Sequence, residues 1–319
     1  MFDKVGDKTV ADRLETTKYV NALTIDVEDC WSIVSRDWLS REIDVTDAVV
    51  RDTEWVLDAL GQQNTRATFF ILGNVAQKFP SLIRRIVDGK HEIGVHGFSH
   101  KQIFKLTKEE FRSEVADVKK LLEDIISASV LGYRAPAFSV IPKTSWALEV
   151  LAEEGFVYDS SIVPCRNRRY GWPGFSRDIC RIDLYGGRSI IEVPMTIVNF
   201  PVIGKGFVTG GGYIRHFPYC LSSFVIKLVQ KHRPVIVYMH PYEFGTGIYP
   251  LSFSHLSKEK KKRAFRHLKF AARNRKSMPC KLRKLLSEFN FSTIRQVVES
   301  TKSCPCGINP VKLDGTEDK

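Results

Sequence analysis

Short apolar segments alternate with amphipathic helical segments along most of this 319-residue chain, and this alternation constrains its fold more than any other feature. Val45–Leu60 has apolar residues at helical spacing, whereas Arg66–Leu72 has the β-branched and aromatic content of a buried strand. Strands that alternate with helices predict a largely parallel sheet, and about seven strands favour an α/β barrel over an open sheet. The other predicted strands are Ala22–Val27, Glu92–His96, Val130–Arg134, Phe156–Asp159, Ser189–Pro194 and Val235–His240.

The composition suits one large α/β domain with a C-terminal appendage, because 43% of the residues are hydrophobic and can bury a sizeable core. We expect a lead-in segment at 1–20, the barrel at 21–249, a basic extension packed on it at 250–301 and a flexible tail at 302–319.

No segment approaches the ~18–20 consecutive apolar residues that span a bilayer, and the charged N-terminal sequence lacks the apolar core of a signal peptide. The seven cysteines are an odd number at wide spacings, which does not indicate a disulfide framework. We therefore expect a cytoplasmic protein.

The positive charge is concentrated near the C-terminus. Residues 257–285 contain thirteen Lys or Arg and one acid, Glu259, so this stretch alone carries the +12 net charge of the chain. Two interpretations remain open: a solvated helix packed on the barrel, or a segment that docks on an anionic membrane face or a lipid-linked glycan. Nucleic acid is not an expected partner, because the sequence has no aromatic–basic platform or known binding motif.

Polar residues follow several predicted strands. His96 and His100 stand four apart, a spacing that would bring both imidazoles to one ion on a helical turn, although two unrelated loop histidines are the alternative. Asp26, Glu28 and Asp29 end the first strand, where buried carboxylates are costly unless they pair or bind a cation. Asp26 and Glu28 share one face of that strand by alternation.

Arg134 and His240 complete this set. Arg134 could hold a carboxylate by a bidentate pair or form a purely structural bridge, and His240 ends the apolar run Val235–Met239. Either residue alone has a structural explanation. The strand ends of a parallel α/β fold converge on one face, so all these side chains together predict an active site there.

The same segments resemble five ordered motifs of the polysaccharide deacetylases, the NodB homology domain of carbohydrate esterase family four. Details at 155–161, 210–213 and 240–244 look closest to the exopolysaccharide and exosortase-associated subgroup. One departure is that Val27 follows Asp26, where family members often have two adjacent acids. The segments that carry the resemblance are Thr24–Asp29, Ala67–Phe70, His96–His100, Arg134–Pro136 and Met239-His240.

The resemblance implies a distorted (β/α) barrel and a metal-dependent hydrolase that removes N-acetyl groups from the amino sugars of an acetylated glycan. It implies one divalent ion, with zinc favoured, bound by His96, His100 and Glu28, with Asp29 as the alternative carboxylate. Asp26 would be the general base, Arg134 would orient it, and His240 would protonate the departing amine.

Further residues are implied around the substrate. Trp31 would lie at its rim, and a backbone N–H near Ala137 or Phe138 would bind the oxyanion. Met239 either shapes the acetyl pocket or belongs to the core, and Asp159 either orients a histidine or caps a turn. The oligomeric state stays open.

Two other functions remain as alternatives at this point. The same fold and metal could hydrolyse cyclic amides or allantoin-like substrates. A catalytically silent binder of anionic surfaces or nucleic acid would use residues 257–285, but it would leave Asp26, Arg134 and His240 without a shared purpose.

Overall fold

The computed structural model describes residues 19–166, 170–199, 206–245, 247, 254, 256–302 and 309–312. The expected lead-in segment lies almost entirely outside this part of the chain. Of the expected flexible tail, residues 309–312 form a strand, β12 (Asn309–Lys312), which pairs with β6 (Cys180–Asp183).

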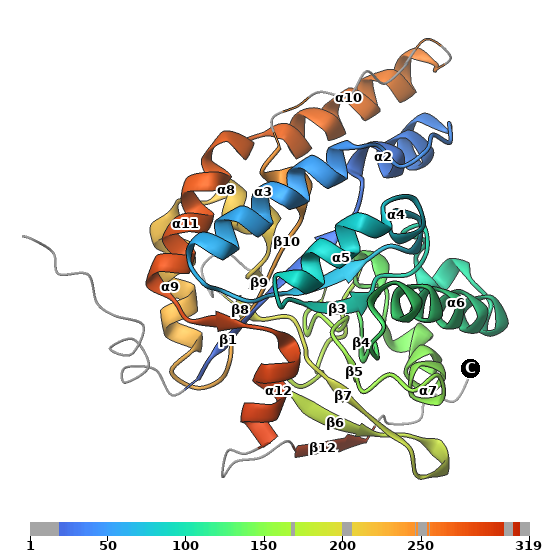
Figure 1. Cartoon of the computed structure of the whole chain (residues 1–319), viewed down its shortest axis with the longest axis vertical. Coiled ribbons are helices and arrows are strands. Elements are labelled where there is room, and N and C mark those ends of the chain that lie inside the picture. Colours follow the sequence, from blue (N-terminus) through green and yellow to red (C-terminus); the bar gives the residue numbers. More distant parts are fainter. Residues whose placement is uncertain are drawn as a thin grey trace, which may run out of the picture.

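A curled, mostly parallel sheet forms the centre of the molecule, as the α/β barrel prediction requires (Figure 1). The strands follow the order β10-β1-β2-β3-β4-β5-β7-β6-β12, so the sheet is a half-barrel in the described residues. The strands from β10 to β7 are all parallel, and β6 runs antiparallel to β7. Their bounds are β1 Asn21–Val27, β2 Thr68–Ile71, β3 Glu92–Val95, β4 Gly132–Tyr133, β5 Tyr158–Asp159, β7 Ser189–Glu192 and β10 Ile236–Met239.

Helices cover the sheet on the outside. The predicted capping box opens α6: Thr107 Oγ1 accepts the N–H of Glu110 at 3.1 Å, and Glu110 Oε2 accepts that of Thr107 at 2.8 Å. Helices α5 and α6 pack on β3. The helices are α2 Cys30–Leu39, α3 Ala48–Gln62, α4 Gly73–Lys78, α5 Pro80–Asp88, α6 Lys108–Ile126, α7 Trp146–Glu153, α8 Gly211–His216, α9 Tyr219–Val229, α10 Lys258–Ala272, α11 Met278–Glu288 and α12 Ile294–Lys302.

The C-terminal residues return to the first strand. The short strand β11 (Phe291–Ser292) pairs with the start of β1, and the N–H of Ile294 donates to Thr68 Oγ1 at 2.8 Å. The remaining two strands, β8 (Ile197–Asn199) and β9 (Gly206–Val208), form a separate antiparallel hairpin. This hairpin and β6 were not expected from the sequence.

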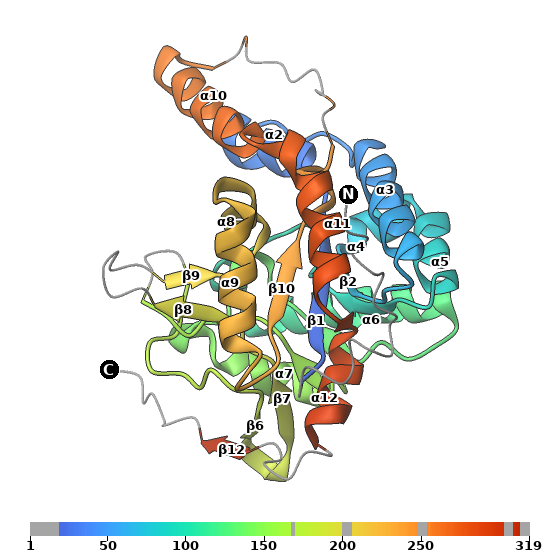
Figure 2. The same cartoon turned by 90° about the vertical axis from the view of Figure 1, so that its left-hand side faces the viewer.

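The basic stretch forms two helices with different surroundings (Figure 2). Helix α10 packs along α2 through a small apolar cluster of Leu39, Leu256 and Ala264. Helix α11 packs near α8, where the Lys281 ammonium donates to three carbonyl oxygens at the end of that helix, including Ile214 O at 2.7 Å. Part of the positive charge therefore has a structural task. None of the described helices is long and apolar enough to cross a membrane.

Candidate active site

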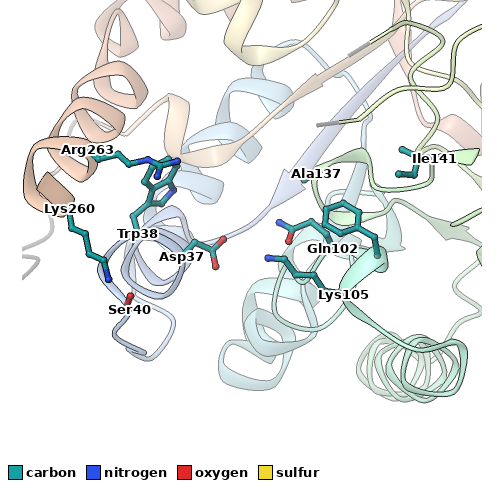
Figure 3. Close-up of a pocket in the computed structure, with 10 residues that line it drawn as sticks. Asp37, Trp38, Ser40, Gln102, Lys105, Ala137, Ile141, Lys260 and Arg263 are labelled. Carbon is teal, nitrogen blue, oxygen red and sulfur yellow. The ribbon is translucent and has the colours of Figure 1, made fainter. Parts of the chain in front are cut away.

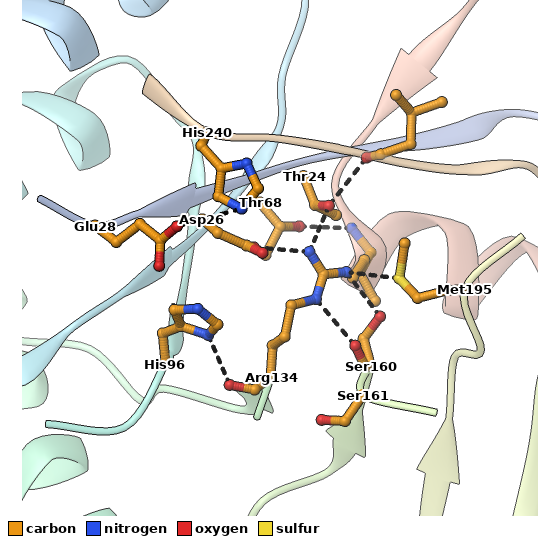
Figure 4. A network of polar contacts seen from close by, with 12 residues as sticks. Thr24, Asp26, Glu28, Thr68, His96, Arg134, Ser160, Ser161, Met195 and His240 are labelled. Carbon is orange, nitrogen blue, oxygen red and sulfur yellow. Dashed lines mark hydrogen bonds and ion pairs between the residues drawn. The ribbon is translucent and has the colours of Figure 1, made fainter. Parts of the chain in front are cut away.

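Arg134 lies at the centre of a buried polar cluster and is itself fully buried (Figure 4). Its Nη1 donates to Asp26 Oδ1 at 2.8 Å and to Thr24 Oγ1 at 2.7 Å. Its Nε and Nη2 donate to the carbonyl and hydroxyl oxygens of Ser160, both at 2.9 Å, and Nη2 contacts Met195 Sδ at 3.6 Å. The guanidinium thus holds Asp26 through one nitrogen, and not through the bidentate pair that was one of the two possibilities, because its other donors reach neighbouring segments.

His96 and His100 meet, but not on the helical turn that their spacing suggested. Residues 96–100 form a loop after β3, in which Gly97 and His100 have φ values of +72° and +62°. These left-handed positions turn the chain so that the two ring centroids lie 5.6 Å apart. The spacing correctly predicted that the two imidazoles lie close together, but the geometry that brings them together is a loop and not a helical turn.

The tautomer of His96 is set by its hydrogen bond. His96 Nδ1 lies 2.8 Å from the carbonyl oxygen of Arg134, and because a carbonyl only accepts, Nδ1 carries the hydrogen. The lone pair on Nε2 is then available to a metal ion. Burial lowers the pKa of His96 to about 4, so the ring is neutral near pH 7, as coordination requires.

Glu28 completes a group of three possible metal ligands. One ligand atom each from Glu28, His96 and His100 lies within 4.8 Å of the others, and Glu28 Oε2 is 3.0 Å from His100 Nε2. Burial disfavours the Glu28 charge, but the nearby His100 and His240 outweigh it and hold the pKa of Glu28 at about 2. Apart from this contact with His100, Glu28 Oε2 has no hydrogen-bond partner within the described part of the chain. This buried anion with two imidazoles fits a divalent metal ion.

Asp29, the alternative carboxylate, is used elsewhere. Its two oxygens accept the N–H groups of Trp31 and Ser32 at 3.2 Å each, which caps the start of α2. They also accept the Thr46 N–H at 2.8 Å and the Thr46 hydroxyl at 2.9 Å. The side chain is therefore committed to local structure, and the structure groups Glu28, but not Asp29, with the histidines.

His240, directly after β10, faces the same carboxylate. Its Nε2 is 3.3 Å from Glu28 Oε1, and its ring stacks on Tyr242 with centroids 4.8 Å apart. Burial disfavours the charged imidazolium, but the carboxylates of Glu28 and Glu243 outweigh burial and raise the pKa of His240 to about 9. The imidazole therefore carries a proton at neutral pH in the chain without a bound ion.

Glu243 is a site residue that our sequence analysis missed. It is buried, its Oε2 accepts the backbone N–H of His240 at 3.1 Å, and the same oxygen lies 3.5 Å from His240 Nδ1. Arg215 Nη1 lies 3.6 Å from the other oxygen. Glu243 thus faces the ring nitrogen that points away from Glu28.

The glycine run at 210–212 is the sequence signal that could have revealed this contact. A Cβ on Gly211 would lie 1.6 Å from Glu243 Oε2, and one on Gly210 would lie 1.9 Å from Tyr238 Cε1. A Cβ on Gly212 would meet nothing within 4 Å. The first two glycines are therefore required by the close approach of Tyr238 and Glu243.

The turn after Arg134 has an unusual backbone. Ala137 and Phe138 are consecutive non-glycine residues with φ of +53° and +54°, in the short helix η2 (Pro136–Phe138). Such conformations cost on the order of 1–3 kcal/mol each and concentrate at functional sites. The Phe138 N–H donates to Ala135 O at 3.0 Å. The Phe138 N–H is thus engaged within the turn, which makes the N–H of Ala137 the candidate oxyanion donor of the two that the sequence suggested.

Trp31 and Met239 contribute little surface to the site. Met239 is fully buried within the main apolar core. Trp31 is 8% exposed, on the first turn of α2, with the Arg275 guanidinium 6.0 Å from its ring centroid. The burial of Met239 favours the second of its two interpretations, a core residue, and the low exposure of Trp31 leaves it little surface at the expected substrate rim.

Asp159 supports the turn after Arg134, and its described contacts include no histidine. Its Oδ1 accepts the Ser161 hydroxyl at 2.5 Å, and Ser161 Oγ accepts the N–H of Ala135 at 2.7 Å. Burial raises the pKa of Asp159 to about 6. Burial and the negative charge of Asp159 raise the pKa of Glu192 well above its ordinary value. The two carboxyl groups therefore hold a proton between them.

Comparison with known families now identifies a domain within the first half of the chain. A family model described as polysaccharide deacetylase matches residues 42–156, and a second, described as a domain of unknown function (DUF3473), matches 160–299. The chain carries a polysaccharide deacetylase domain. The site spans both matches: His96, His100 and Arg134 lie in the deacetylase match and His240 and Glu243 in the second, while Asp26 and Glu28 precede both.

Curated relatives share part of the deacetylase domain. A peptidoglycan-N-acetylglucosamine deacetylase of Bacillus cereus is 30% identical over 42% of this chain and 46% of its own length. A peptidoglycan deacetylase of Helicobacter pylori is 31% identical over 30% of this chain and 32% of its own length. The chain therefore aligns with less than half of either relative.

One solved structure matches almost the whole chain, including both family matches. A protein of Mycobacterium smegmatis, assigned as a polysaccharide deacetylase, has a TM-score of 0.60 at 17% identity and covers 95% of this chain and 96% of its own. At this identity the match shows that the two chains share a fold. It extends to nearly the full length, so the second half of the chain is part of that fold.

Glu28 and Asp29, the two alternative carboxylates, should differ in metal binding. We expect Glu28→Gln to weaken divalent metal binding by at least about 10-fold, because it removes a ligand charge. Asp29→Asn should keep the metal, since its oxygens cap α2. Metal content by mass spectrometry after dialysis, with melting temperature as the folding control, checks this. Equal metal loss in both variants would contradict the assignment of Glu28.

The Asp159–Glu192 pair should make stability fall with rising pH. Both carboxyl groups have pKa values raised above about 4, their value in the unfolded chain. Between pH ~4 and these raised values, the folded state therefore binds more protons than the unfolded state. The stabilisation is complete below pH ~4 and is lost as pH rises through 6 and above. We expect Glu192→Gln to flatten this decline, because an amide donates to Asp159 without proton uptake.

The measurement is the free energy of urea unfolding between pH 4.5 and 8. Glu109→Gln, an exposed change on α6, is the matched control and should follow the wild-type profile. Parallel profiles for wild type and Glu192→Gln would show that the pair does not share a proton.

Proposed function

We propose that this chain is a metal-dependent hydrolase that removes N-acetyl groups from the amino sugars of a glycan. The observation that carries the proposal is the grouping of Glu28, His96 and His100 beside Asp26 and His240 at the carboxyl ends of the strands. Support also comes from curated relatives named as peptidoglycan N-acetylglucosamine deacetylases. Hydrolysis of this carbon–nitrogen bond needs an activated water, a base, an acid and oxyanion donors, and each has a candidate here.

Glu28, His96 and His100 would hold the metal ion. Two imidazole nitrogens and one carboxylate oxygen, with further positions open, are a ligand set that suits zinc, which is the ion we propose. When bound, such an ion polarises the acetyl carbonyl and lowers the pKa of a water molecule. The hydrogen bond from His96 Nδ1 to the Arg134 carbonyl fixes the ligand tautomer in advance.

Asp26 is the proposed general base. Its Oδ1 is held by Arg134 Nη1, so the carboxylate cannot rotate freely. Asp26 lies on β1, two residues before Glu28, and this short separation supports a base next to the proposed metal ligands. Arg134 itself is a positioning residue, since its five donors are all engaged with protein acceptors.

His240 is the proposed general acid. Its Nε2 faces Glu28 and would deliver a proton to the departing sugar amine, while Nδ1 faces Glu243. The Glu243 carboxylate would stabilise the protonated ring and fix its orientation, as carboxylates do for catalytic histidines in general. The Ala137 N–H would bind the oxygen that becomes negative at the tetrahedral stage.

The setting that we propose is the synthesis of a surface glycan or exopolysaccharide. It rests on the resemblance of segments 155–161, 210–213 and 240–244 to the corresponding deacetylase subgroup. The glycine run at 210–212 and Glu243 belong to these segments, so the features that resemble the subgroup also build the His240 environment.

The direct test is acetate release from N-acetylglucosamine oligomers with and without a chelator. We expect Asp26→Asn to lower kcat by on the order of 10²–10⁴-fold with metal content unchanged, because a general base is lost. Asp124→Asn, an exposed change on α6, is the control and should keep full activity. No acetate from the metal-loaded wild type on any acetylated glycan would refute the proposed activity.

The role of Glu243 can be separated from simple structural support. We expect Glu243→Gln to lower kcat by about 10²-fold on N-acetylglucosamine oligomers, whose amine must be protonated to leave. Activity on an aryl acetate should change little, since its leaving group departs without a proton. A structural defect would lower both activities together.

The two neighbouring glycines give a matched pair for the same question. Gly211→Ala should reproduce the Glu243→Gln pattern, because the new Cβ displaces the carboxylate, whereas Gly212→Ala should behave as wild type. Full amide hydrolysis by correctly folded Gly211→Ala would argue against a role for Glu243.

A further inference from the structure

A cavity of about 750 Å³ opens beside the proposed active site, and its charge is not explained by deacetylation (Figure 3). It reaches Ala137, the proposed oxyanion donor, and Gln102, two residues after His100. The volume lies in the range of ordinary ligand sites and would take a disaccharide-sized group. A glycan with its acetyl group at the metal site would therefore continue into this cavity.

The two walls come from different parts of the chain. Figure 3 shows Trp38 of α2 and Ser40, directly after that helix, beside Lys260 and Arg263 of α10 on one side, and Gln102 and Lys105 on the other. Helix α10 lies within the match to the domain of unknown function. The second half of the chain thus supplies a wall of the cavity as well as His240 and Glu243.

Positive charge dominates the lining. Lys105, Lys260 and Arg263 are cationic, and none of them has a carboxylate within 4.0 Å among the described residues. The single acid, Asp37, accepts a hydrogen bond from Arg36 Nε at 2.7 Å, which neutralises it. Three cations without acidic partners around one cavity favour an anionic ligand.

Aromatic side chains add a surface that suits a sugar ring. Phe104, on η1 (Ile103–Lys105), is 51% exposed although it is large and apolar. Across the cavity, the Arg263 guanidinium lies over the Trp38 ring, 5.3 Å from its centroid. This contact orients a planar donor group that is well suited to carboxylate or phosphate oxygens.

We propose that this cavity binds an oxyanion carried by the glycan next to the acetylated sugar, so that the substrate class is an acidic glycan. The proposal rests on the proposed deacetylase function for the position of the acetylated unit. The oxyanion is either the carboxylate of a uronic acid or the phosphate of a phosphorylated or lipid-linked sugar. Both present oxygen atoms to Lys105, Lys260 and Arg263.

The test is binding to the full-length chain in chelator, measured by calorimetry. Three probes separate the sources of charge: neutral chitohexaose, a hyaluronan hexasaccharide with carboxylates, and UDP-N-acetylglucosamine with a diphosphate. We expect one anionic probe to bind about tenfold more tightly than chitohexaose at low salt, and this preference to shrink at high salt. The tighter anionic probe identifies carboxylate or phosphate as the preferred group.

Two double variants with equal loss of charge give the matched control. Lys260→Gln with Arg263→Gln should abolish the preference, whereas Lys262→Gln with Lys269→Gln, exposed residues of α10 that do not line the cavity, should keep it. Equal affinity for all three probes, or equal effects of the two double variants, would overturn the proposal. Binding of the same variants to phosphatidylglycerol vesicles gives one more outcome. If both double variants lose vesicle binding while their glycan binding is unchanged, the proposal is overturned and α10 is assigned to a membrane surface.

Acetate release distinguishes this proposal from the one on which it rests. In one outcome, metal-loaded wild type releases no acetate from chitohexaose or hyaluronan, yet the preference for anionic probes depends on Lys260 and Arg263. The proposal of an anion-binding cavity is then supported and the proposed deacetylase function is refuted. If acetate is released but neither binding nor KM responds to charge in the probe or in the cavity, the deacetylase function stands and the acidic-glycan proposal fails.

Discussion

The buried guanidinium of Arg134 is the interaction on which the rest of the site depends. A charge without contact with water is costly unless every donor is satisfied, and here the acceptors come from β1, from the residue after β5 and from Met195. The ring of Phe70 on β2 lies beneath it, 4.3 Å from the guanidinium carbon. One side chain therefore fixes the relative positions of three strand ends, and its own carbonyl orients His96.

Much of the site could be predicted from strand ends alone. Asp26, Glu28, Arg134 and His240 converge because parallel strands present their carboxyl ends on one face, and this rule needs only the alternation of strands and helices. The geometry inside loops could not be predicted in this way. His96 and His100 meet through two left-handed residues, and the strain at Ala137 and Phe138 has no signature in a single sequence.

Contacts between distant segments were the other feature of the site that could not be predicted from the sequence. Gly211, 32 positions before Glu243, leaves room for the Glu243 carboxylate beside His240, and Asp29 accepts two hydrogen bonds from Thr46, 17 positions later. The strands β4 and β5 contain only two paired residues each, and both begin two residues later than the apolar runs that predicted them. The basic stretch was uniform in composition but serves separate tasks in α10 and α11.

The central position of β1 has a consequence for how the protein is made. This strand is among the first described residues, yet two of its neighbours, β10 and β11, follow more than 200 residues later. During synthesis β1 can pair with β2 early, while its other edge has to wait until most of the chain has left the ribosome. An apolar strand with an unpaired edge invites association with other chains, so the nascent protein passes through a vulnerable interval that ends only when its last quarter emerges.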